Sequence, residues 1–223
     1  MLTFATPVFA AQAVPIPRQK PVHLAPIVET EVPSNSAQTS VKACQKLLGG
    51  LDVQWEASPP IGNGSGCGTP TPIIVSRVGG ISIAPVATLN CPMAQALSQW
   101  VEKSLKPAAV KFGHGITQID NASSYVCRLR NNQASGKMSE HAFANAIDVS
   151  GLVFDDGSRI SVKQDWSGLL SIIGASPKAK FLKRIRGEAC NYFTTVLGPG
   201  DPNHDDHFHV DLKQRSAGYR ICQ

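Results

Sequence analysis

The sequence predicts an α+β fold in a single domain, with a small antiparallel sheet flanked by helices. Two segments carry apolar residues at helical spacing, one after Pro92 and one from about Lys178 to Val196. Other segments alternate apolar and polar residues, as half-buried strands do. With 223 residues, of which 42% are hydrophobic, the chain is long enough to bury a substantial core.

The amino-terminal residues are expected to precede the folded domain. Residues 1–13 are largely apolar and end in Ala11-Gln12-Ala13, which fits the small-x-small pattern of a signal-peptidase site. No Lys or Arg precedes the apolar run, so we interpret 1–13 as a signal-peptide remnant, with a hydrophobic tail as the alternative. Residues 14–39 are rich in proline and predict an extended linker. The domain then covers residues 40–223.

The first half of the domain is expected to begin with a short helix. Ser40 is its predicted N-cap, and Gly49 ends it. From Leu51 to Pro85, prolines and glycines separate short strands such as Ile73–Val78. The helix after Pro92 is predicted to bury Leu97, Trp100, Val101 and Leu105.

The second half is expected to supply three strands and a long helix. The strands are predicted near Tyr125 to Arg130, Ala146 to Phe154 and His207 to Leu212. The helix from about Lys178 to Val196 is expected to bury Phe181, Leu182, Ile185, Ala189 and Phe193.

Cysteine usage points to an oxidising compartment. Zinc fingers and thioredoxin-type sites need closely spaced cysteine pairs, and this chain has no such pair. An even number of widely spaced cysteines favours three disulfides, although the sequence does not select their pairing, and six buried free thiols are the alternative. A periplasmic or secreted protein is therefore expected. The cysteines are Cys44, Cys67, Cys91, Cys127, Cys190 and Cys222.

Net charge and hydropathy exclude two other classes. The formal net charge is +5, but the basic residues are scattered, so nucleic-acid binding is not expected. No apolar stretch approaches the ~20 residues that span a bilayer, so no transmembrane segment is expected.

Four of the six histidines fall in two short segments, Ser139–Asp148 and His204–Leu212. In a strand from His207, the side chains of His207, His209 and Asp211 share one face, and the apolar residues between them share the other. In the first segment Asp148 would likewise point away from its apolar neighbours. His141 precedes Asp148 by seven positions, an odd number, so a turn must separate them.

Two histidines and one aspartate that converge from these segments would make a three-ligand zinc site. Zinc accepts imidazole nitrogen and carboxylate oxygen in tetrahedral geometry. Three protein ligands leave a fourth position for water, which is typical of a catalytic site, whereas structural sites are closed by four ligands.

Both segments resemble the motifs of LAS-type zinc peptidases. This group includes penicillin-insensitive murein endopeptidases, zinc D-alanyl-D-alanine carboxypeptidases and VanX-type dipeptidases. The first segment resembles their SxHxxGxAxD signature in Ser139-x-His141-x-x-Ala144-x-Ala146-x-Asp148. The second motif is matched by Asp206-x-x-His209 and the overlapping His207-x-His209.

The chain from about Cys44 to Cys222 also resembles the bacterial extensin-like C-terminal domain. The matching stretches are Tyr125-x-Cys127-Arg128, Ser139-Glu140-His141-Ala142, Ala146-Ile147-Asp148, Leu197-Gly198-Pro199-Gly200, His207-Phe208-His209 and Tyr219-Arg220-x-Cys222. The two resemblances together imply a LAS/hedgehog-like metallopeptidase fold.

The zinc-peptidase resemblance assigns roles to individual residues. It makes His141, Asp148 and His209 the zinc ligands. It implies that Asp206 is the general base and that His207 stabilises an oxyanion or orients substrate. It also implies that Arg128 binds substrate or polarises its carbonyl, with a structural ion pair as the alternative role for Arg128.

One position departs from the signature. Ala144 stands where the signature has Gly, and if that position needs φ > 0, alanine strains the turn by ~1 kcal/mol.

The expected function is zinc-dependent hydrolysis of an amide bond in peptidoglycan peptide stems or cross-links. The alternatives are a zinc-containing, catalytically inactive cell-wall-binding module and a metal-free disulfide domain. His114 and His204 are expected to be hydrogen-bonded surface residues. Asp205 and Asp211 are the alternatives to Asp206 for the role of base.

Overall fold

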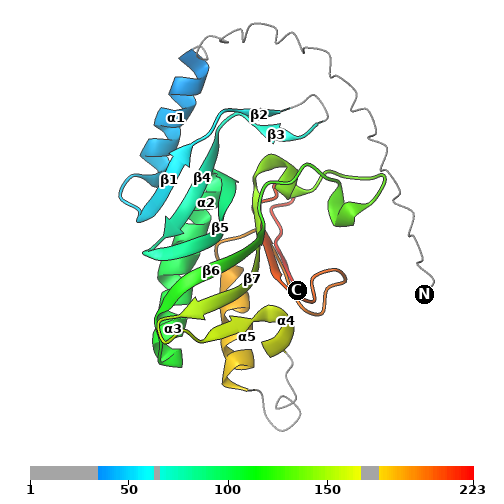
Figure 1. The fold of residues 1–223 in the computed structure, drawn as a ribbon. Coiled ribbons are helices and arrows are strands. Elements are labelled where there is room, and N and C mark those ends of the chain that lie inside the picture. The colour runs from blue at the N-terminus through cyan, green and yellow to red at the C-terminus, as the bar shows by residue number, and fades with distance from the viewer. Residues whose placement is uncertain (1–34, 63–65, 167–175) are drawn as a thin grey trace, which may run out of the picture. The chain divides into compact units, whose positions relative to one another are not determined.

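The structure is a computed structural model that describes residues 35–62, 66–166 and 176–223 (Figure 1). The predicted leader, 1–13, and the linker up to residue 34 lie outside the described residues. None of the described helices is long and apolar enough to cross a membrane.

A nine-stranded mixed sheet forms the centre of the described part, in the order β1-β4-β5-β6-β7-β10-β9-β11, with β8 also paired to β7. The pairs β5–β6 and β9–β11 are parallel, and the other pairs are antiparallel. The strands are β1 (Val53–Ala57), β4 (Pro72–Val78), β5 (Ile81–Asn90), β6 (Ile116–Ser123), β7 (Ala146–Phe154), β8 (Arg159–Ser161), β9 (Thr195–Leu197), β10 (Phe208–Asp211) and β11 (Ile221–Cys222). A separate hairpin pairs β2 (Ile61–Gly62) with β3 (Gly68–Thr69).

Helices α2, α3 and α5 lie on one side of this sheet (Figure 1). A π-helical turn at Val101–Leu105 joins α2 to α3. The helices are α1 (Asn35–Leu48), α2 (Cys91–Trp100), α3 (Lys106–Phe112), α4 (Val162–Asp165) and α5 (Pro177–Ala189), and short 3₁₀ turns occur at η2 (Arg130–Asn132) and η3 (Glu140–Phe143). The prediction of a single α+β domain is confirmed, although the sheet is larger than expected and mixed.

The predicted helix after Pro92 is confirmed. The side chain of Asn90 accepts a hydrogen bond from the backbone N–H of Met93 and so caps α2. The four side chains predicted to be buried by this helix are fully buried: Leu97, Trp100, Val101 and Leu105.

Three predicted boundaries are wrong. The first helix begins at Asn35 rather than Ser40. The last helix ends at Ala189 rather than near Val196, because the β-branched Thr195 and Val196 pair with β10. Residues 125–130 do not form a strand; isolated backbone hydrogen bonds to residues 137–141, including the bridge between Leu129 and Met138, and the disulfide of Cys127 hold this segment in place.

Three disulfides confirm the prediction from the cysteine spacing. They pair Cys44 with Cys91, Cys67 with Cys127 and Cys190 with Cys222. The first joins α1 to the start of α2, the second joins β3's hairpin to the segment before Arg128, and the third joins the end of α5 to β11.

An aromatic pair lies at the centre of the helical side of the core. Trp100 and Phe193 are both fully buried, and their rings meet edge to face with centroids 5.8 Å apart. The indole N–H of Trp100 donates to the carbonyl of Ile185 at 3.1 Å, which ties α2 to α5.

We predict that Phe193→Ala lowers the free energy of unfolding by about 3–5 kcal/mol, because it removes a buried ring and leaves a cavity beside Trp100. Urea denaturation followed by tryptophan fluorescence measures this change. The control Val110→Ala, at a side chain that is 76% exposed, is expected to change stability by less than about 0.5 kcal/mol. Equal effects of the two substitutions would contradict this account of the core.

Candidate metal centre

Strand register brings two of the three predicted metal ligands together. In the antiparallel pair β7–β10, His209 lies directly opposite Asp148. Opposed residues on one face of such a pair have Cβ atoms about 4.5–5.5 Å apart. Ile147 and Val149 on β7 are buried in the core, so Asp148 points to the sheet face opposite the helices, as the alternation predicts.

His141 reaches the same place from a turn. The hydroxyl of Ser139 accepts a hydrogen bond from the backbone N–H of His141 and caps η3. Ala144 ends η3 in the left-handed region, with φ of 52°. The predicted turn before β7 is therefore present, and the position of Ala144 does have positive φ. His141 nevertheless lies beside Asp148 and His209.

The three candidate ligand atoms form a nearly equilateral triangle. His141 Nε2 lies 3.1 Å from Asp148 Oδ1 and 3.1 Å from His209 Nδ1, and the latter two atoms are 2.9 Å apart. Tetrahedral zinc with bonds of about 2.0–2.1 Å separates its ligand atoms by about 3.3 Å. The donor set therefore fits a zinc ion with little adjustment.

The outer nitrogen of each imidazole is held by an acceptor. His141 Nδ1 donates to the carbonyl oxygen of Ser124, and His209 Nε2 donates to Asp211 Oδ2 at 3.0 Å. A carbonyl oxygen can only accept a hydrogen bond, so Nδ1 of a neutral His141 carries the proton and its inward Nε2 carries a lone pair. An ionised Asp211 likewise only accepts, so the inward Nδ1 of a neutral His209 also carries a lone pair. Metal-binding histidines commonly have such outer partners.

Charge in the metal-free site is distributed unevenly. Burial by itself lowers the pKa of His209, but hydrogen bonds and charges from Asp148 and Asp211 outweigh it and raise that pKa to about 9. Burial raises the pKa of Asp148, but its hydrogen bonds to His141 and His209 hold it far below the usual range. A proton on His209 therefore occupies the place where a metal cation would sit.

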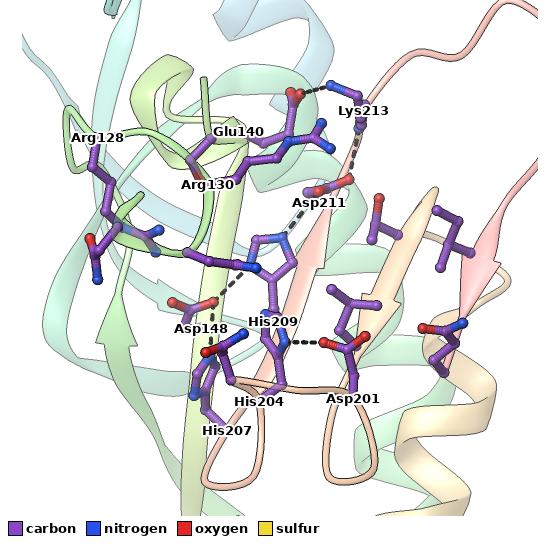
Figure 2. Close-up of a pocket in the computed structure, with 18 of the residues that line it drawn as sticks. Arg128, Arg130, Glu140, Asp148, Asp201, His204, His207, His209, Asp211 and Lys213 are labelled. Carbon is purple, nitrogen blue, oxygen red and sulfur yellow. Dashed lines mark hydrogen bonds and ion pairs between the residues drawn. The ribbon is translucent and has the colours of Figure 1, made fainter. Parts of the chain in front are cut away.

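His207 stands next to the triangle, and Asp206 stands behind it. His207 Nε2 lies 3.7 Å from Asp148 Oδ1 (Figure 2), and its Nδ1 lies 2.7 Å from Asp206 Oδ1. Asp206 lies in the turn before β10, as its proposed role requires. Its side chain is 56% exposed, and the hydrogen bond with His207 lowers the pKa of its carboxyl.

A cavity of about 460 Å³ opens over the triangle. Asp148, His207 and His209 line it, and so does Arg128, as the resemblance implied. Asp206 is not among its lining residues. Arg130 lines this cavity as well (Figure 2). The other basic lining residues are Lys213, which is paired with Glu140, and Arg215.

The structure places two further residues of the site differently from what the sequence predicted. His204 is buried rather than on the surface; it lines the cavity and bonds to Asp201, and burial lowers its pKa. Its signal in the sequence is only its closeness to His207 and His209. Asp211 was weighed as a base but is buried behind His209, and the i, i+2 spacing on one strand face is the signal for that pairing.

His114 lies apart from this centre. Its Nδ1 is 3.4 Å from both Asp155 Oδ1 and Asp156 Oδ2, and all three side chains are solvent-exposed. This geometry agrees with the expected hydrogen-bonded surface histidine.

Comparison with known proteins gives one family. The family model of the extensin-like protein C-terminus matches residues 42–223. No curated protein and no solved structure matches the chain.

We predict that the purified protein binds one zinc ion per chain and that Asp148→Ala removes this binding, because one corner of the ligand triangle is lost. Metal analysis after dialysis measures the stoichiometry. His114→Ala is the matched control and is expected to retain full zinc content. Retention of zinc by Asp148→Ala would contradict the assignment.

We predict opposite pH dependences for stability and for zinc affinity. Because the pKa of His209 is raised from 6.5 to about 9, protonated His209 stabilises the metal-free protein below about pH 6.5, and this stabilisation is lost as pH rises toward 9. Zinc must displace that proton, so zinc affinity is expected to increase over the same range. Denaturation of metal-free protein and calorimetric zinc titration at several pH values measure the two effects.

The comparison variant for this experiment is His209→Gln. It cannot titrate, so its metal-free stability is expected to fall less between pH 6.5 and 9 than that of the wild type. An identical pH profile for both proteins would show that His209 is not the titrating group.

Proposed function

We propose that this chain, which belongs to the family of extensin-like protein C-termini, is a zinc metallopeptidase that hydrolyses an amide bond in peptidoglycan peptide stems or cross-links. The observation that carries the proposal is the triangle of His141, Asp148 and His209, with atoms 2.9–3.1 Å apart, at the floor of a cavity of about 460 Å³. Three buried ligands beneath an open cavity are typical of a catalytic rather than a structural zinc site.

The three ligands approach the metal position from one side. His141 is fully buried beneath it, whereas Asp148 and His209 border the cavity. A zinc ion held there supplies Lewis-acid chemistry: it polarises a carbonyl oxygen and lowers the pKa of bound water to about 7. The outer partners Ser124 and Asp211 keep both imidazoles oriented for this ligation.

Proton transfer is proposed for Asp206 and His207 acting together. His207 Nε2 faces the triangle, and Asp206 fixes the opposite ring nitrogen. In the reaction, the oxygen of water adds to the amide carbon, the C–N bond breaks, and the proton taken from water passes to the leaving amine. Asp206 thus contributes to the base through His207, since its own carboxylate lies outside the cavity.

Substrate binding is proposed for the basic side chains at the cavity. Peptidoglycan stems carry carboxylates, and Arg128 and Arg130 line the cavity near the ligand triangle. A guanidinium binds a carboxylate through two parallel hydrogen bonds. The three disulfides favour an oxidising location, so a periplasmic or secreted protein is part of the proposal.

The second candidate is an inactive zinc-containing module that binds the cell wall. The strained backbone of Ala144, where related signatures have Gly, favours it. Against it, the ligand triangle is intact although Ala144 has positive φ.

We predict that zinc-loaded protein releases cleaved muropeptides from isolated sacculi and that His141→Ala abolishes the release. His207→Ala is expected to reduce the rate about 10²–10⁴-fold, the usual loss on removing a general base. Asp206→Asn is expected to cost less, because it leaves His207 in place. Chromatography of released muropeptides measures these rates.

His114→Ala is the control for this series and is expected to act like the wild type. If Asp206→Asn is more damaging than His207→Ala, Asp206 acts directly on water and not through His207. Retained zinc and sacculus binding without new amine ends would favour the inactive module.

A further inference from the structure

A second cavity adjoins the candidate centre. Its volume is about 330 Å³, and His207 lines both this cavity and the larger one. The side chains that surround it are polar or small: Asp120, Ala122, Ser150, Arg159, Ser161, Lys163, Gln164, Asp206 and His207. The imidazole of His207 therefore separates two spaces, one over the ligand triangle and one beyond it.

The two cavities follow one strand. Asp148 and Ser150 on β7 are two residues apart, so their side chains point to the same face about 7 Å from each other. Asp148 lines the larger cavity, and Ser150 lines the smaller one. A single groove on the open face of the sheet thus continues on both sides of His207.

The second cavity lies where the pairing of β7 changes from one strand to another. One edge of β7 is paired with β10 over residues 146–149 and with β8 over residues 151–153. Ser150 lies at the junction between the stretch of β7 that pairs with β10 and the stretch that pairs with β8. The space above the junction belongs to the second cavity.

We propose that the site is endo-acting: substrate chain extends on both sides of the scissile amide, as in a peptide cross-link, and the bond cut is not the last one of a stem. This inference rests on the proposed peptidase function. An enzyme that removes one terminal residue needs a small closed space on one side of the bond. Both cavities here lie in the size range of about 300–1,000 Å³ that holds drug-sized ligands, which is far more than one alanine needs.

The charges of the two cavities fit a peptide that carries polar groups on both sides. The larger cavity has Arg128 and Arg130 for carboxylates, whereas Arg215, which also lines it, donates to Thr194 and Thr195. In the smaller one, Arg159 forms an ion pair with Asp120, and Lys163 adds a further cation. Most of the residues that line the two cavities are polar or charged, so hydrogen bonds and charge are expected to contribute to recognition on both sides.

The first test compares two purified substrates with zinc-loaded protein: a cross-linked muropeptide dimer and a monomeric pentapeptide muropeptide. We expect kcat/KM for conversion of the dimer to monomers to exceed that for release of terminal D-alanine by at least about tenfold. Release of terminal D-alanine alone would overturn the inference and leave the peptidase proposal standing. Cleavage of neither substrate by zinc-loaded protein would overturn both.

The second test measures binding without turnover. Calorimetry with chelator-treated, metal-free protein is expected to give a dissociation constant for the dimer about tenfold lower than for the monomer. Ala122 is exposed on β6 and lines the smaller cavity, so Ala122→Trp is expected to fill that space and abolish the difference. Val110→Trp, on the exposed surface of α3, is the matched control and should bind both ligands as the wild type does.

Two results of the binding experiment would overturn the inference. One is equal affinity of the wild type for dimer and monomer. The other is an unchanged preference for the dimer in Ala122→Trp, since the second half of the substrate would then lie elsewhere.

Discussion

Three lone pairs that point at one place repel each other, and the site depends on how the fold withstands this repulsion. When both rings are neutral, His141, Asp148 and His209 each direct an electron pair inward, and a cation at the centre makes the arrangement favourable. In the metal-free protein a proton on His209 serves that purpose, which is why its pKa is raised to about 9. Ser124 and Asp211 prevent either ring from turning its other nitrogen inward.

The stability of the core supports this arrangement from the opposite face of the sheet. Ile147 and Val149 on β7, with Phe208 and Val210 on β10, are almost fully buried. A slip of one residue in the β7–β10 register would expose these apolar side chains and bury Asp148 and His209 among them. Burial of the apolar face therefore fixes the positions of the polar ligands, because a slip in register would carry a large free-energy cost at every residue of the pair.

The sequence correctly predicted the features that depend only on side-chain periodicity and residue spacing. Alternation predicted β7 at its observed bounds and the facing of Asp148 and His209, because a strand's side-chain directions depend only on local geometry. It failed for residues 125–130, which have the composition of a strand but make only isolated backbone hydrogen bonds to residues 137–141. The burial of His204 was also missed, because it depends on contacts between separate elements. The contact of Asp211 with His209 was missed although both residues lie on β10, where their spacing puts them on one face.

The disulfide between Cys67 and Cys127 has a consequence for ligand binding. Cys127 directly precedes Arg128, and the irregular segment that carries Arg128 and Arg130 has little sheet pairing of its own. The cross-link ties this segment to the β2–β3 hairpin and reduces the conformational entropy that the segment would lose on binding a ligand. With reduced thiols this segment would be less constrained, so the Cys67–Cys127 disulfide is expected to preorganise the arginines that line the cavity.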